Sequence, residues 1–171
     1  HRGAAESFDI SADLEELAHT DVIVVCAGAK AILDIEKTLE VLETNGVPVI
    51  GYGIDVVPAF WSRDSGLPAP LRLDTAEEVA GHARMRKRLG IAGGTLIANP
   101  VPQDAAMDPI EIDSFIEQAL SDAETTGVTG KAVTPFLLQR IFELSEGRSL
   151  ETNIALVLHN AAVAAQIAVA L

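Results

Sequence analysis

The chain has 171 residues, of which 49% are hydrophobic, and a mean hydropathy of +0.28. This length is sufficient for one domain with a sizeable core, and the composition excludes a disordered chain. The net charge of -13, from 12 basic and 25 acidic residues, argues against a nucleic-acid partner or an anionic membrane surface.

The first informative segment is Asp9-Ile-Ser-Ala-Asp13, which places two carboxylates and a hydroxyl at alternate positions. In an extended segment these three groups point to one face, which suits a hard divalent cation or sugar hydroxyls. The alternative is a helix cap, in which Ser11 or Asp13 begins a helix over residues 14–19 and Glu16 takes the capping-box position. A cap accounts for only one of the three polar residues, so both interpretations stay open.

A continuous apolar, largely β-branched run over residues 22–26 predicts a strand buried on both faces of a parallel sheet. The small residues 27–29 leave space beyond its end, and Lys30 follows them. Ligands of open α/β sheets bind beyond the carboxyl ends of strands, so Lys30 lies where a substrate is expected. An apolar environment favours the neutral amine, which attacks carbonyl groups to form a Schiff base. The alternative is a solvated lysine at the start of a helix.

An apolar stripe and the stop signal Asn45-Gly46 predict a helix over residues 31–44, and residues 47–52 form the next strand. This strand–helix–strand unit demands a parallel pair of strands and a right-handed crossover. The segment Gly51-Tyr-Gly53 lacks the third glycine of a dinucleotide-binding fingerprint and carries little weight.

Residues 55–63 follow the second strand and include Phe60, Trp61 and Arg63. Core or interface packing of the two aromatic rings, with Arg63 paired to an acid, explains them at least as well as substrate contact. The turn residues of segment 64–70 predict a loop next to the strand end, where it can act as a lid.

The remaining elements are predicted from caps, glycines and apolar periodicity. They are helices over residues 75–89, 111–125, 134–144 and 150–171, and a strand over residues 94–98. The element order predicts an α/β fold, a layered α/β/α arrangement with a largely parallel sheet and a helical C-terminal region. We expect residues 1–171 to form a single domain.

Cys26, the one cysteine, has no disulfide partner, which fits a reducing cytosol. A small core residue is a simpler interpretation of it than a nucleophile. The chain opens on His1 and Arg2 without a secretory signal. Three polar side chains interrupt the Ala-rich end, residues 154–171, so we expect a buried or oligomer-facing helix there rather than a membrane span. A cytoplasmic protein is therefore expected.

Seven blocks, in order along the chain, resemble the pseudouridine-5'-phosphate glycosidase family, also called the pseudouridylate synthase or indigoidine-synthase-A-like family. The blocks are His1-Arg-Gly-Ala4, Phe8-Asp-Ile-Ser-Ala-Asp-Leu14, Val25-Cys-Ala-Gly-Ala-Lys-Ala-Ile-Leu-Asp34, Pro58-Ala-Phe-Trp-Ser-Arg63, Ala98-Asn-Pro-Val-Pro102, Thr134-Pro-Phe-Leu-Leu138 and Thr152-Asn-Ile-Ala-Leu156. Members of this family are much longer, so the chain is expected to be the C-terminal part of a longer protein. The family's general-acid glutamate and a phosphate-binding lysine have no counterpart in it.

The resemblance implies reversible cleavage of pseudouridine 5'-phosphate to uracil and ribose 5-phosphate. A C-glycosidic bond has no heteroatom leaving group to protonate, so two-carboxylate glycosidase chemistry does not apply directly. The resemblance implies instead a Schiff base between Lys30 and C1' of the ring-opened sugar. Two alternatives remain: another Schiff-base sugar-phosphate lyase or aldolase, and an inactive half that serves oligomer contacts.

The resemblance also implies a cofactor, a substrate site and an assembly. The cofactor is Mn²⁺, with Mg²⁺ as the alternative, bound by Asp9, and oxygen ligation suits either ion. The implied substrate-binding residues are Ser11, Ala12, Asp13, Asn153 and His1, the last of them near the phosphate. The family further implies a homo-oligomer, namely a homotrimer.

Overall fold

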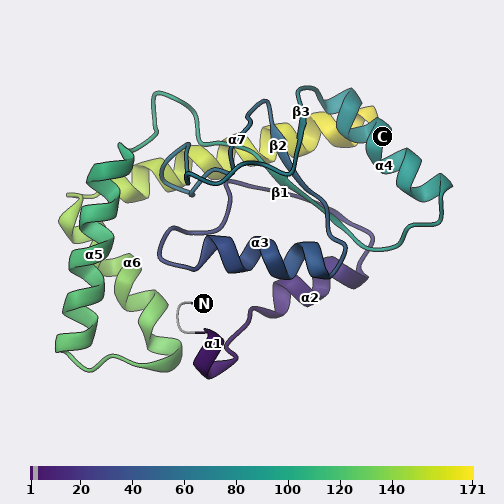
Figure 1. Cartoon of the computed structure of the whole chain (residues 1–171). Coiled ribbons are helices and arrows are strands. Elements are labelled where there is room, and N and C mark those ends of the chain that lie inside the picture. Colours follow the sequence, from purple (N-terminus) through teal and green to yellow (C-terminus); the bar gives the residue numbers. More distant parts are fainter. Residues whose placement is uncertain (2–3) are drawn as a thin grey trace.

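The structure is a computed structural model that describes His1 and residues 4–171 (Figure 1). Arg2 and Gly3, which belong to the first of the seven blocks, lie outside the described residues. The elements in chain order are α1 (Ala4–Ser7), α2 (Ala12–His19), β1 (Ile23–Cys26), α3 (Ile35–Thr44), β2 (Val49–Tyr52), β3 (Leu71–Leu73), α4 (Ala76–Arg88), β4 (Thr95–Ala98), α5 (Pro109–Thr125), the 3₁₀ helix η1 (Gly130–Ala132), α6 (Val133–Leu144) and α7 (Arg148–Ala170).

A four-stranded sheet forms the centre of the fold, with strand order β1-β4-β2-β3 and all three pairs parallel. The predicted parallel sheet is therefore confirmed. The expectation that β1 and β2 pair directly is wrong, because β4 lies between them. Ile97 of β4 is fully buried, as a strand with neighbours on both edges requires. The sequence pattern did not predict β3, a short and largely exposed strand at the edge of the sheet.

Helices cover both faces of the sheet, which confirms the layered α/β/α arrangement (Figure 1). On one face, Val79 of α4 and Ile167 of α7 pack in the same cluster as Ile97. On the other face lie α2 and α3, where Leu42 of α3 packs in one cluster with Val49 of β2. The sheet therefore has an apolar layer on each side.

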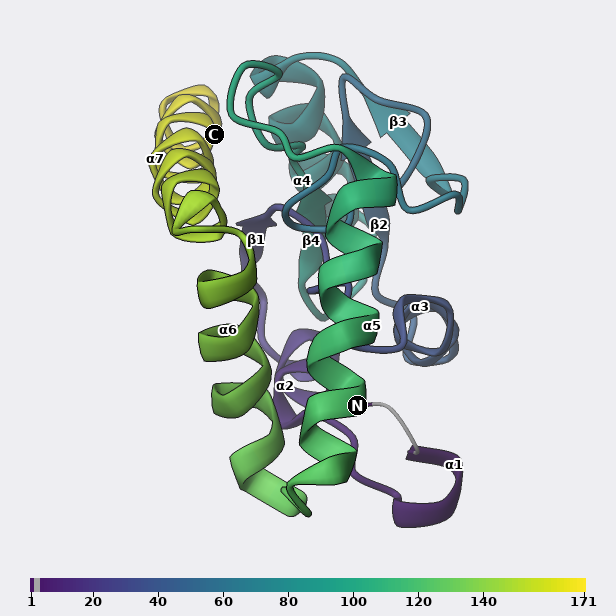
Figure 2. The same cartoon turned by 90° about the vertical axis from the view of Figure 1, so that its left-hand side faces the viewer.

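The helices α5 and α6 form a hairpin at one end of the molecule (Figure 2). Ile112, Ile116 and Ile141 form its apolar centre together with Trp61. The Trp61 indole N–H donates to the carbonyl oxygen of Ser149 over 3.2 Å, and so this buried ring joins the hairpin to the start of α7. Aromatic packing thus fixes the hairpin to the sheet domain.

The predicted helix over residues 31–44 begins later than expected, at Ile35. Asp34 is its N-cap, since its side chain accepts a hydrogen bond from the backbone N–H of Lys37 over 3.1 Å. Residues 31–34 form a turn instead, in which the Leu33 N–H donates to the Lys30 carbonyl oxygen over 2.8 Å. The capping carboxylate, rather than the apolar stripe, sets the start of the helix.

The last helix, α7, is apolar on two sides. Leu156, Val163 and Ile167 are buried against the rest of the chain, whereas Ile154 and Leu158 are exposed. Among the described helices, α7 alone is long and apolar enough to cross a membrane, a test that core helices of soluble proteins also pass. The structure thus gives α7 one core face and one open apolar face.

Candidate functional site

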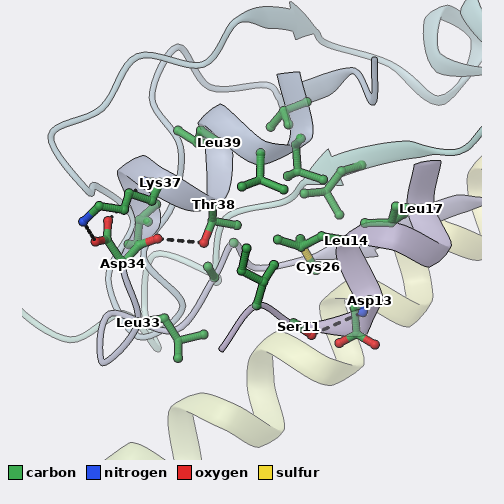
Figure 3. A pocket seen from close by; sticks show the side chains of 18 of the residues that line it. Ser11, Asp13, Leu14, Leu17, Cys26, Leu33, Asp34, Lys37, Thr38 and Leu39 are labelled. Carbon is green, nitrogen blue, oxygen red and sulfur yellow. Dashed lines mark hydrogen bonds and ion pairs between the residues drawn. The ribbon is translucent and has the colours of Figure 1, made fainter. Parts of the chain in front are cut away.

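A cavity of about 730 Å³ opens between α2, α3 and one face of the sheet (Figure 3). Four of the residues predicted to form the site line it: His1, Ser11, Asp13 and Lys30. Asp9, Ala12 and Asn153 are not among the lining residues. Much of the remaining wall is aliphatic and belongs to the sheet and the two helices.

The loop that carries Lys30 is fixed at Gly28, just beyond the end of β1. Gly28 has a φ of +82°, and a Cβ at this position would lie 1.8 Å from the Pro58 carbonyl oxygen. Only glycine permits so close an approach of the two loops. The Phe60 N–H also donates to the Ala27 carbonyl oxygen over 2.9 Å. The loop that carries Lys30 is therefore fixed by the adjacent loop of Pro58 and Phe60.

The side chain of Lys30 is half-buried, and its Nζ lies 5.3 Å from the centroid of the Phe60 ring. An aromatic face attracts a cation at this range. The Phe60 ring meets Trp61 edge-on, with 5.1 Å between the ring centroids. The structure places Lys30 beyond the carboxyl end of β1, as predicted, and not at the start of a helix.

The predicted packing role is confirmed for Trp61, whereas the predicted acidic partner of Arg63 is not found among the described residues. Trp61 is 2% exposed and belongs to the core. Arg63 donates through Nη1 to the Val101 carbonyl oxygen. The expected ion pair of Arg63 with an acid is absent among the residues that the structure describes.

Ser11 is the N-cap of α2, and its side chain accepts a hydrogen bond from the Asp13 N–H over 3.3 Å (Figure 3). The helix begins at Ala12, so Asp13 lies in its first turn, where a carboxylate complements the helix dipole. The extended arrangement that would align Asp9 with both residues is therefore wrong. Ser11 and Asp13 nevertheless both face the cavity.

Asp9 lies next to His1 and has an exposed side chain. The His1 Nδ1 is 3.3 Å from the Asp9 Oδ1, and the Asp9 side chain is 63% exposed. No group of three or more His, Cys, Asp or Glu side chains suited to a metal ion occurs among residues 1 and 4–171. Mg²⁺ and similar hard cations keep several water ligands and are often bound through only one or two carboxylates, so Asp9 can hold such an ion without a three-residue cluster. The metal stays a prediction.

Asn153 lies in the first half of α7 and is half-buried. The neighbouring Thr152 hydroxyl donates to the Ala105 carbonyl oxygen over 2.8 Å. One turn later, Leu156 packs in a cluster with Ala27 and Phe60, which brings α7 close to the Lys30 loop. The structure thus brings this part of α7 to the back of the loop, while Asn153 itself stays outside the cavity lining.

The cavity wall contains two charged residues, Asp34 and Lys37, that were not predicted as site residues. Lys37 and Asp34 form an ion pair, with 2.5 Å between Nζ and Oδ2. Hydrogen bonds from the Lys37 side chain, and then from its backbone N–H, hold the pKa of Asp34 below its ordinary value. Cys26 also lines the cavity, and burial raises the pKa of its thiol, which fits a core residue rather than a nucleophile. The only sequence signal for this pair was that Asp34 is a residue type suited to cap the helix that follows it.

A family profile described as indigoidine synthase A like protein matches residues 1–170. Over all 171 residues the chain is 63% identical to the pseudouridine-5'-phosphate glycosidase of Paracoccus denitrificans (strain Pd 1222), covering 56% of that protein. It is 62% identical to the pseudouridine-5'-phosphate glycosidase of Methylobacterium nodulans, covering 51% of it. The chain thus spans about half the length of the curated relatives it matches.

Solved structures with related sequences have the same fold. A prealnumycin C-glycosynthase in complex with ribulose 5-phosphate matches 99% of this chain and 56% of its own length, with a TM-score of 0.93 and 34% identity. An indigoidine synthase A like protein from Thermotoga maritima matches 94% of this chain and 53% of its own, with a TM-score of 0.82 and 35% identity.

Proposed function

Because the chain belongs to the family of indigoidine synthase A like proteins, we propose that it forms part of a pseudouridine-5'-phosphate glycosidase. Such an enzyme reversibly cleaves the C-glycosidic bond of pseudouridine 5'-phosphate, giving uracil and ribose 5-phosphate. One observation carries the proposal: a half-buried lysine, Lys30, beyond the end of a parallel strand and in the wall of a large cavity. Relatives that cover the whole chain at up to 63% identity carry this name.

In the proposed reaction, the neutral amine of Lys30 adds to C1' of the ribose. The bond from C1' to the ring oxygen breaks, and that oxygen takes a proton. The nitrogen lone pair then expels C5 of uracil, which is protonated, and an iminium remains between Lys30 and C1'. Water adds to the iminium, and the amine departs to leave open-chain ribose 5-phosphate. Synthesis is the reverse sequence.

The neighbouring residues would bind and orient the substrate. Ser11, Ala12 and Asp13 are proposed to contact it from the start of α2, and two of these three residues already line the cavity. His1 is proposed to lie near the phosphate, and Asn153 to reach the site from α7. The substrates are small and polar, and the net charge of -13 supports the absence of nucleic-acid or membrane partners.

Asp9 would supply one oxygen ligand to the implied Mn²⁺, or to Mg²⁺. Since no cluster of three or more metal-ligating side chains occurs among the described residues, no step of the reaction is assigned to the ion. We further propose a cytoplasmic homo-oligomer, namely a trimer. The exposed apolar side of α7, with Ile154, Leu158 and Val169 on it, supports an assembly of this kind.

The test is reductive trapping of the imine. The chain is incubated with ribose 5-phosphate and borohydride, its intact mass is measured, and the adduct is mapped. We expect one sugar-phosphate adduct on Lys30, lost in Lys30→Ala. Lys37→Ala is the matched control, since Lys37 also lines the cavity and is held by Asp34, and it should keep the adduct.

Two further outcomes separate the alternative functions. Adding uracil should consume the iminium and form pseudouridine 5'-phosphate, whereas an aldolase is indifferent to the base. The partial coverage of the relatives favours a second candidate, an inactive half that serves oligomer contacts. In that case the adduct forms only after the unmatched segment of a relative is supplied. An adduct on neither preparation would overturn the proposed role of Lys30.

A further inference from the structure

A buried asparagine, Asn99, directly follows β4 and is 1% exposed. Its backbone N–H donates to the Cys26 carbonyl oxygen over 2.7 Å, one residue beyond the last paired positions of β1 and β4. Cys26 is the last residue of β1, and Lys30 follows it four residues later. The backbone of Asn99 thus holds the strand end from which the Lys30 loop, residues 27–30, leaves the sheet.

The side chain of Asn99 binds α7. Its Nδ2 donates to the Asn160 Oδ1 over 2.9 Å and lies 3.1 Å from the His159 Nδ1. An amide nitrogen has two hydrogens, so it donates to both groups when this histidine nitrogen carries no proton. The same His159 nitrogen lies 3.1 Å from the Pro100 carbonyl oxygen, to which it donates in the other tautomer. In both tautomers, residues 99–100 are hydrogen-bonded to two consecutive residues of α7.

Beyond these polar contacts, α7 packs on the sheet through apolar side chains only a few of which are large (Figure 1). Residues 161–170 are mostly alanine, and Val163 and Ile167 pack there in one cluster with Ile97 of β4. Small apolar side chains select the rotation of a helix weakly, whereas one buried polar contact selects it strongly, as an asparagine does in a coiled coil. The bonds from Asn99 are therefore suited to set the rotation of α7.

The face of α7 that these bonds turn towards the sheet also supports the Lys30 loop. Leu156 lies one turn before Asn160, on the same face of the helix. Leu156 is buried and packs in one cluster with Ala27 and Phe60. The Phe60 N–H donates to the Ala27 carbonyl oxygen, and the Phe60 ring faces the Lys30 Nζ. A rotation of α7 would therefore move the support of the loop.

Stability alone does not account for an amide at position 99. The Asn99 Oδ1 is buried and has no hydrogen-bond partner in the described part of the chain. A buried acceptor without a partner destabilises the folded state, and an apolar side chain of similar shape, such as leucine, would avoid this loss. The buried amide thus fits a geometric role better than a purely stabilising one.

We propose that Asn99 is a positioning residue for Lys30. Its backbone holds the end of β1, and its side chain sets the rotation of α7, whose Leu156 supports the Lys30 loop. Asn99 is not among the residues that line the cavity, so it acts through these contacts and does not touch the substrate. The inference rests on the proposed role of Lys30 in imine formation. Displacing a reacting group by about 1 Å can slow a reaction by ~10²-fold, so loss of these bonds should slow the chemistry more than it weakens binding.

The experiment compares Asn99→Leu, Asn160→Leu and the double variant in borohydride trapping with ribose 5-phosphate. The maximal rate of trapping and the half-saturating concentration are measured separately. Each single variant should lower the maximal rate roughly tenfold or more, with a half-saturating concentration within about threefold of that of the unsubstituted chain. Val163→Ala is the matched control, because Val163 is buried on the same helix and makes apolar contacts only. It should change the maximal rate by less than about twofold.

The double variant separates positioning from stability. Its two leucines leave no polar atom buried between strand and helix, so the midpoint of urea unfolding should equal or exceed that of Asn99→Leu. Trapping should stay slow, because an apolar pair does not set the rotation of α7. Recovery of the trapping rate together with the stability would overturn the proposal. An effect of Val163→Ala as large as that of Asn99→Leu would also overturn it.

Hydrogen exchange tests the same contacts without the reaction. The amides of Phe60 and Leu33 donate to the carbonyl oxygens of Ala27 and Lys30, the two ends of the loop. Both amides should exchange about tenfold faster in Asn99→Leu and normally in the control variant. Unchanged exchange in Asn99→Leu would overturn the proposal. If the unsubstituted chain forms no adduct, the proposed reaction is contradicted instead, and hydrogen exchange then decides this inference alone.

Discussion

The Nζ of Lys30 faces the ring of Phe60 at 5.3 Å from the centroid. Phe60 has a φ of +69°, a conformation that costs a non-glycine residue about 1–2 kcal/mol. The backbone N–H of the same residue holds the end of β1 through the Ala27 carbonyl oxygen. A single residue in a strained conformation thus fixes the loop of Lys30 and also presents a ring to its amine.

Replacing the ring tests what it contributes to the iminium. The ring attracts a positive charge at Nζ, which the iminium carries and the attacking neutral amine does not. Phe60→Leu should therefore cost the iminium ~0.5–1 kcal/mol relative to that amine. Borohydride trapping should therefore yield roughly two- to fivefold less adduct. Phe60→Tyr keeps the aromatic face and should trap normally, and equal yields from both variants would contradict this role.

Ser11 offers a way to separate capping from substrate contact. Ser11→Ala removes the cap of α2 and should lower the free energy of unfolding by about 1 kcal/mol, whereas Ser11→Gly should cost only a few tenths. Both changes remove the hydroxyl that faces the cavity. If this hydroxyl binds the sugar phosphate, both variants need equally more ribose 5-phosphate for half-maximal trapping. Urea unfolding measures the stability of both variants. If Ser11→Ala loses more binding than Ser11→Gly, in proportion to its greater loss of stability, Ser11 is only a cap.

The contact of Gly28 with Pro58 predicts a steric cost on top of a conformational one. Gly46→Ala introduces a Cβ at a φ of +69° with no atom within 4 Å, so it should cost about 1–2 kcal/mol. Gly28→Ala meets the Pro58 carbonyl oxygen at 1.8 Å as well as a positive φ, and should cost at least twice as much. Thermal or urea unfolding of the two variants measures the difference. Equal losses would show that the two loops separate without a penalty.

Because His82 is partly buried, we expect the protein to lose stability in mild acid. Burial, and then the charge of Arg86, holds the pKa of His82 below its ordinary value, and its Nδ1 is buried without a partner among the described atoms. The unfolded chain therefore binds the proton more readily than the folded one. Stability is fully present above the ordinary histidine value of about 6.5 and falls as the pH drops towards the lower folded value.

His82→Leu removes this titration and is the variant to compare. Between pH 7.5 and pH 5.5, the midpoint of urea unfolding should fall further for the unsubstituted chain than for His82→Leu. His19→Leu is a suitable control, because His19 is exposed at the end of α2. An identical pH response of His82→Leu and the unsubstituted chain would contradict the assignment to His82.

Most of the elements, though not the edge strand β3, were predictable from the sequence because their signals are local. The apolar run of β1, the Thr75 capping box of α4 and the Asp108 cap of α5 each act within a few residues. Strand order was not predictable in the same way. β4 lies between β1 and β2 and pairs with both of them. This arrangement depends on packing between segments that are distant in the sequence.

The candidate site shows the same division between local and distant information. The position of Lys30 beyond β1 follows from one apolar run and three small residues. For Phe60 the sequence left core or interface packing and substrate contact as alternatives, and neither its positive φ nor its position beside Lys30 has a local sequence signal. For Asp9 and Asp13 the alternating pattern left an extended segment and a helix cap as alternatives, and the structure shows the cap, because Ser11 begins a helix between them.

Of the strands that the structure describes, the inner strand β4 comes last in the chain. β1 ends at residue 26, and the strand that pairs with it ends at residue 98. At ribosomal speeds this interval lasts roughly 4–14 s, during which the apolar run 22–26 lacks β4, its partner among the described strands. A nascent chain in this state presents the kind of segment that chaperones bind and that aggregates when they do not. The strand order of the finished sheet thus leaves an apolar strand exposed for seconds during synthesis.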